Sequence, residues 1–139
     1  MAQPTPMKAT RLVLLSELRG LTVTRTSLDG ADAVCLDQQL LAAAGFVEHE
    51  KVDVLVLTTG TRFACRLLAS PTQGEVALTG PAAHLVREGD ALSLSAFGWM
   101  KGKAAQKHVP SVVQALEGNV VSGPPLARPE KKKSKSKVA

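Results

Sequence analysis

The chain has 139 residues, of which 45% are hydrophobic, and this is enough for one domain with a packed core. One Trp, three Phe and no Tyr leave Val, Leu and Ala to build that core. Residues 1–120 contain eleven Lys or Arg and eleven Asp or Glu, so the net charge of +5 lies wholly in residues 121–139 and does not indicate a nucleic-acid-binding body.

The cysteines and the N-terminal segment predict a reducing, cytoplasmic location. Cys35 and Cys65 stand alone, without C-x-x-C spacing, and the three histidines are scattered, so neither a disulfide framework nor a metal site is predicted. The first residues lack the basic and apolar regions of a secretory signal. No apolar run approaches the roughly 20 residues that span a bilayer.

The first 36 residues predict a leader followed by short strands. Residues 1–10 contain two prolines and few apolar side chains, which indicates a loose leader. Apolar or alternating patterns predict strands at 10–18 and 21–26, separated by Arg19 and Gly20. A turn at 27–30 and an apolar strand at 33–36 follow.

A short helix and a hairpin are expected next. The Asp37 carboxylate can cap the amides of a two-turn helix at 38–44, and Gly45 suits its C-terminal end. The β-branched run at 52–58 predicts a strand that turns back at 59–61.

The rest of the folded body is predicted to contain a second short helix and four more strands. A second short helix is expected at 80–86, with Pro81 in its first turn. Further strands are predicted at 62–69, 75–79, 91–97 and 109–116. Many short strands with two short helices predict a mainly β protein, a small β-barrel spanning residues 11–118. Residues 119–139 form a Pro- and Lys-rich basic tail, predicted to be disordered because it can bury little apolar area.

Several landmarks in fixed order carry a resemblance to a known family. They are Leu-Thr-Val-Thr at 21–24, Leu-Asp-Gln at 36–38, Glu-Lys-Val-Asp-Val at 50–54, Thr-Gly-Thr-Arg-Phe at 59–63, Gly-Pro-Ala-Ala-His at 80–84, Gly-Asp at 89–90 and Ser-Ala-Phe at 95–97. Because these landmarks occur in this order and spacing, the chain resembles the pyruvoyl-dependent L-aspartate alpha-decarboxylases over nearly its whole folded body. The resemblance implies a six-stranded double-psi β-barrel and a homotetramer with active sites between subunits.

The family makes its cofactor by cutting its own chain at a Gly-Ser bond. The serine hydroxyl attacks the preceding carbonyl, and elimination leaves a pyruvoyl group that accepts electrons during loss of carbon dioxide. At this bond the present chain has Asp32 and Ala33, and alanine has no hydroxyl. Cys35 is a conceivable substitute nucleophile, although a thiol packed as a small apolar side chain is the interpretation we favour. Ser27 precedes the turn and follows Thr26 instead of Gly.

Other functional positions implied by the resemblance have also changed. The substrate-binding lysine aligns with Glu17, the tyrosine proton donor with Arg66, and its threonine neighbour with Cys65. Gly30 takes the place of a tyrosine and Thr79 that of an asparagine.

A few positions of the substrate site are kept. Arg62 aligns with the arginine that pairs with the substrate carboxylate, and Gly80 and Ala82 align with the turn that contacts substrate through its backbone. Pro81 removes one amide donor between them. If a ligand site survives, these three turn residues, Arg62 and Cys65 are expected to form it, and His84 lies beside them.

Three hypotheses follow. The leading one is an uncleaved, non-catalytic paralogue, without a cofactor, that has a structural or regulatory role in a homo-oligomer or together with an authentic decarboxylase. The alternative is an active aspartate 1-decarboxylase with a pyruvoyl group, processed at an unusual bond and making beta-alanine for pantothenate biosynthesis. The third is a module in which Arg62 and the Gly80 turn bind a small carboxylate.

The basic tail has two interpretations. Its five lysines could bind nucleic acid or an anionic surface with strong salt dependence, or they could only solubilise the chain. The second is favoured, because no aromatic or amphipathic stretch accompanies them. The lysines are Lys131, Lys132, Lys133, Lys135 and Lys137.

Overall fold

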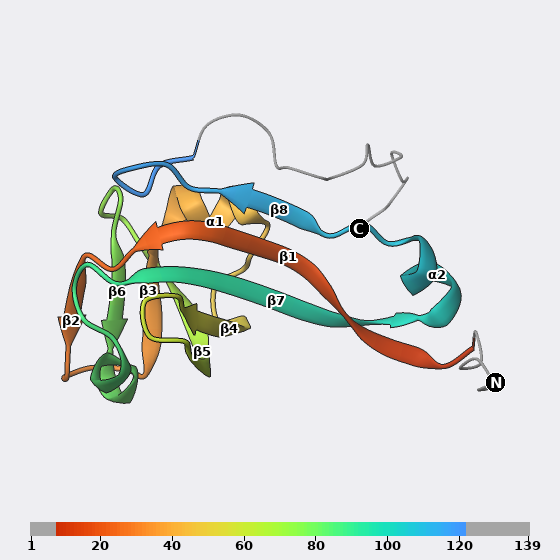
Figure 1. Cartoon of the computed structure of the whole chain (residues 1–139), viewed down its shortest axis with the longest axis horizontal. Helices are drawn as coiled ribbons and strands as arrows, with labels where there is room; N and C mark the ends of the chain where they lie inside the picture. Colours follow the sequence, from red (N-terminus) through yellow and green to blue (C-terminus); the bar gives the residue numbers. More distant parts are fainter. Residues whose placement is uncertain (1–7, 122–139) are drawn as a thin grey trace.

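The computed structural model describes residues 8–121 and shows a mainly β protein built around one sheet (Figure 1). The expected tail lysines and most of the expected leader lie outside these residues. The sheet has eight strands in the order β2-β6-β3-β5-β4-β7-β1-β8. In chain order they are β1 (Thr10–Thr22), β2 (Arg25–Ser27), β3 (Ala33–Asp37), β4 (Lys51–Val56), β5 (Thr61–Ser70), β6 (Val76–Thr79), β7 (Ala91–Lys101) and β8 (Ser111–Gln114).

The mainly β class is confirmed, and the sheet within the described residues has two strands more than the six expected. Its outermost strands, β2 and β8, are only three and four residues long. Each pairs in parallel with one neighbour, β2 with β6 and β8 with β1. Strand β3 also pairs in parallel with β5, whereas the remaining ladders are antiparallel. These parallel pairings join segments far apart in the chain, which alternation within each strand does not reveal.

Strand β1 is longer than expected because Gly20 does not end it. Gly20 has a φ of +78°, and the register with β7 shifts between Leu18 and Leu21, so the strand passes through a bulge and continues to Thr22. The break comes instead at Val23 and Thr24, before β2.

The core is built from aliphatic side chains, as the composition predicts. Alternation puts one face of each strand inside, and Val52, Val54 and Val56 of β4 are at most 1% exposed. Leu92 and Leu94 of β7 meet them from the neighbouring strand. On the opposite face of β4 and β5, residues such as Lys51, Arg62 and Arg66 are exposed.

Three short helices complete the fold of residues 8–121. Helix α1 (Gln38–Ala44) is capped as predicted: the Asp37 carboxylate accepts from the Gln39 N–H at 2.8 Å, and Gly45 closes it with a φ of +77°. The expected second helix is a 3₁₀-helix, η1 (Gly80–Leu85). Helix α2 (Gly102–Lys107) was not predicted, since its N-cap, Lys101, makes no side-chain capping bond and the helix starts with a glycine.

The folded body extends past residue 118. Asn119 is 2% exposed and has a φ of +56°. Its amide oxygen accepts from the Thr22 N–H at 2.8 Å, and its amide nitrogen donates to the carbonyls of Thr22 and Gly74 at 2.9 Å. The expected start of the tail at 119 is therefore too early, because this side chain ties the segment to β1. Across residues 8–121, none of the helices combines the length and apolar character needed to cross a bilayer.

Candidate active-site remnant

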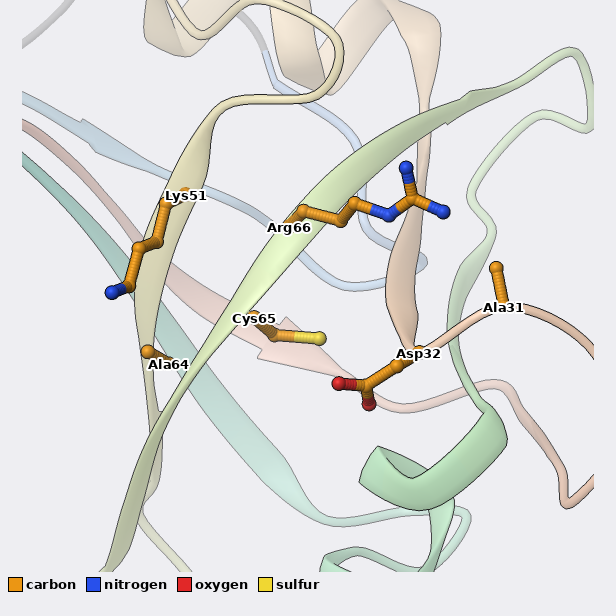
Figure 2. Close-up of a pocket in the computed structure, with 6 residues that line it drawn as sticks. All are labelled: Ala31, Asp32, Lys51, Ala64, Cys65 and Arg66. Carbon is orange, nitrogen blue, oxygen red and sulfur yellow. The ribbon is translucent and has the colours of Figure 1, made fainter.

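The pocket beside the turn before β3 collects several of the predicted site residues. It has a volume of about 410 Å³ and lies between strands β4 and β5 and the loop at residues 31–32 (Figure 2). Six residues line it: Ala31, Asp32, Lys51, Ala64, Cys65 and Arg66.

Strand register explains why these side chains meet. Arg66 of β5 lies opposite Lys51 of β4 and opposite Ala33 of β3, which places the three at one level of the sheet. In Figure 2 the Arg66 side chain extends toward β3, whereas the Lys51 ammonium points the other way. Within the described residues neither cation forms an ion pair. The pocket lining therefore contains two cations and one carboxylate, that of Asp32, and no ion pair among the described residues fixes either cation.

Asp32 is held by the neighbouring turn. Its carboxylate accepts a hydrogen bond from the Ala82 N–H at 3.1 Å. Gly80, with a φ of +66°, packs so closely that a Cβ there would lie 2.9 Å from the carbonyl oxygens of Gly30 and Ala31. The retained turn thus contacts the protein's own carboxylate, and one backbone donor of that turn is already used.

Ala33 is fully buried inside a regular ladder. It is 0% exposed and pairs with Arg66 on one side and Thr79 on the other. The Thr79 hydroxyl donates to the Ala31 carbonyl at 2.5 Å. The Asp32–Ala33 bond thus enters β3 directly, and the Ala33 side chain there is a buried methyl group.

Cys65 lies in the pocket but is a poor nucleophile. The residue is 5% exposed, and its thiol points toward Asp32 in Figure 2. Burial, followed by the negative charge of Asp32, raises the pKa of the Cys65 thiol to about 11. At neutral pH the group is a neutral thiol, and a thiol attacks far more slowly than a thiolate.

Cys35 occupies the middle of β3. It pairs with Leu68 of β5 and Ala77 of β6, so the Val34–Cys35 bond has ordinary ladder partners on both sides. Both cysteines are free. An N-to-S shift at this bond would have to displace a carbonyl carbon fixed within the sheet.

The remaining predicted residues lie near the pocket without lining it. Arg62 is exposed on β5, on the same face as Ala64 and Arg66. Gly80, Pro81 and Ala82 reach the site through the contact of Ala82 with Asp32. Lys51 was missed, because only the pairing of β4 with β5 brings it opposite Arg66. Within residues 8–121 no three His, Cys, Asp or Glu side chains gather as a metal-binding set.

Comparison with known proteins places this chain in one family. The sequence profile described as aspartate decarboxylase matches residues 9–122. The chain belongs to this family. It is 34% identical to the aspartate 1-decarboxylase of Phenylobacterium zucineum over 110 residues, which cover 78% of this chain and 93% of the relative. The aspartate 1-decarboxylases of Hyphomonas neptunium and Campylobacter fetus are 36% and 31% identical over 110 residues, covering 78% and 79% of this chain and 93% and 96% of theirs.

Proposed function

We propose that this protein is an uncleaved, non-catalytic member of the aspartate decarboxylase family, with a structural, regulatory or ligand-binding role. One observation carries the proposal: the residue at the processing position is Ala33, a buried strand residue that has no β-oxygen. Without that oxygen no ester forms from the Asp32–Ala33 amide and no pyruvoyl group results.

The surroundings of Ala33 support the same conclusion. The nearby thiol of Cys65 stays protonated at neutral pH, and Cys35 is fixed between two strands. Arg66 stands where the resemblance implies a proton-donating tyrosine, so the phenolic hydroxyl of that tyrosine is missing. In this proposal processing therefore lacks a nucleophile, and decarboxylation lacks the proton donor that the resemblance implies.

Mass spectrometry of the denatured protein tests this proposal. A single chain of 14.6 kDa is the expected result. Two fragments, the larger beginning with a pyruvoyl group, would refute it. The double variant Asp32→Gly, Ala33→Ser gives a matched comparison, because it restores the family's bond in the same host and purification.

The second candidate is an active aspartate 1-decarboxylase processed at another bond. The names of the relatives and their coverage of nearly the whole fold favour it, as does the retained Arg62. In that case a pyruvoyl group would be the cofactor and aspartate the substrate. Carbon dioxide release from labelled aspartate, abolished by borohydride reduction, is the result that this candidate requires.

A ligand-binding role is the most direct use of the pocket that remains. Arg62 and Arg66 offer cations to a small carboxylate, but Asp32 already occupies the Ala82 amide. Binding stabilises the folded state, so a thermal-shift screen with aspartate and other dicarboxylates tests this role. An Arg62→Gln variant is the control, and an identical shift in both proteins rules out binding at this arginine.

The proposal includes a cytoplasmic homo-oligomer, a tetramer by resemblance to the family. Association with an authentic aspartate decarboxylase is the regulatory version of this assembly. Co-purification from the native host, followed by analysis for a cleaved decarboxylase chain, tests it directly. The lysine tail is assigned a solubilising role, and deletion of residues 124–139 is expected to leave salt-dependent nucleic-acid retention unchanged.

A further inference from the structure

The carboxylate of Asp32 stands inside the pocket beside β3. Asp32 lines this pocket together with Cys65 and Arg66, and its carboxylate accepts the Ala82 N–H at 3.1 Å. In Figure 2 the carboxylate lies between the Cys65 thiol and helix η1. A negative group of the protein itself therefore shares the pocket with a cation and already uses a backbone donor at its edge.

The backbone on both sides of Asp32 is fixed, so the side chain is presented in one place. Ala33 is fully buried and pairs with residues of β5 and β6 in the sheet. On the other side, the Thr79 hydroxyl donates to the Ala31 carbonyl at 2.5 Å, and a Cβ on Gly80 would lie 2.9 Å from the same carbonyl oxygen. A carboxylate that is preorganised by its own chain loses little freedom on binding, so it competes well with a carboxylate from solution.

We propose that Asp32 acts as a tethered ligand, a side chain that occupies the place of a ligand carboxylate in this pocket and so excludes small dicarboxylates. Two effects act together: the carboxylate uses the Ala82 N–H, and its charge repels a second carboxylate that approaches Arg66. The inference rests on the uncleaved chain and the ligand-binding role of the proposed function. It names the residue that determines which ligands the pocket accepts.

Gain of binding on removal of Asp32 tests this role. Succinate is the probe, because it has two carboxylates and no amine, and isothermal titration calorimetry on the full chain measures its dissociation constant. We expect Asp32→Ala to bind succinate at least about tenfold more tightly than the unmodified protein, because a hydrogen bond to a charged group contributes about this much to affinity. Asp32→Asn keeps an acceptor for the Ala82 N–H and removes only the charge, so its gain should be smaller.

Two control variants and one chemical readout locate the effect in this pocket. Asp29→Ala removes the same charge from the same loop, at an exposed residue that does not line the pocket, so succinate affinity should not change. Adding Arg66→Gln to Asp32→Ala should abolish the gain. Succinate should also slow alkylation of Cys65 in Asp32→Ala, followed by mass spectrometry of the peptide that contains it, because the ligand then lies beside the thiol. Circular dichroism verifies that each variant is folded.

The proposal is overturned if the unmodified protein binds succinate as tightly as Asp32→Ala, or if Asp32→Ala does not bind it. Equal gains in Asp32→Asn and Asp32→Ala overturn it as well, because repulsion of charge would then be sufficient without occupation of the pocket. Mass spectrometry of the denatured chain reads cleavage independently of succinate binding, so failure of this inference and failure of the proposed non-catalytic role remain distinguishable.

Discussion

The protonation of Cys65 gives a direct test of how the pocket is built. A pKa of about 11, against 9.0 for an unperturbed cysteine, corresponds to roughly a hundredfold smaller thiolate fraction at pH 7.5. In a Cys35→Ser background, Cys65 is the only thiol, and the peptide that contains it can be followed separately from alkylated amines. Its alkylation rate, followed by mass spectrometry from pH 7 to 12, should therefore rise with a midpoint near 11.

Replacing Asp32 by Asn separates the two main causes of this shift. The amide oxygen can still accept the Ala82 N–H, so the turn is kept, but the charge that disfavours the thiolate is removed. The alkylation midpoint should move to lower pH without reaching that of a free thiol, because burial remains the larger cause. A midpoint at or below 9 in the unmodified protein would refute the assignment and reopen the question of Cys65 as a nucleophile. Circular dichroism at each pH confirms that the reacting state is folded.

Three further predictions concern stability. Asn119→Ala removes three hydrogen bonds and should lower the urea unfolding free energy by about 3 kcal/mol, whereas a loss below 1 kcal/mol would mean that the segment is not anchored there. The Ser70 hydroxyl donates a hydrogen bond to the Glu75 carboxylate and so holds the pKa of Glu75 below its ordinary value of 4.5. The ionised Glu75 carboxylate therefore stabilises the fold above pH 4.5, and this stabilisation is lost as the pH falls through the pKa of Glu75 in the folded protein. Glu75→Gln should thus lower the free energy of unfolding by about 1 kcal/mol at pH 7 and by progressively less below pH 4.5. An equal loss of unfolding free energy at pH 7 and below pH 4.5 would contradict this linkage. Gly80→Ala forces a left-handed φ and a contact at 2.9 Å, for which we expect a thermal destabilisation of about 2–4 kcal/mol, clearly larger than for Gly89→Ala, where the added Cβ meets no atom.

The sequence predicted local features well because their causes are local. Alternating apolar residues marked the strands, and Asp37 and Gly45 marked the ends of α1. The bulge at Gly20 was not predicted, since a glycine between two apolar runs is equally compatible with a break in the strand.

The pocket depends on strand pairing, which one sequence does not specify. Lys51 lines the pocket because β4 pairs with β5 in the register that places it opposite Arg66. Likewise, Arg11 of β1 lies opposite Met100 of β7, 89 positions later in the chain, and composition alone does not predict this pairing. Ala33 is different, because its assignment to the processing position rests on the landmarks that flank it in the sequence and stays a prediction.

The pairing of β1 has a consequence for the order in which the protein folds during synthesis. Strand β1 is made first, yet its ladder partners are β7 and β8, and Thr22 is bonded to Asn119, 97 residues later. A ribosome that has finished β6 has therefore exposed a strand with both edges open and much of its apolar face uncovered. Such long-range closure slows folding and exposes the nascent chain to misassociation. Strand β8, the last strand of the described residues, completes the sheet that the first strand began.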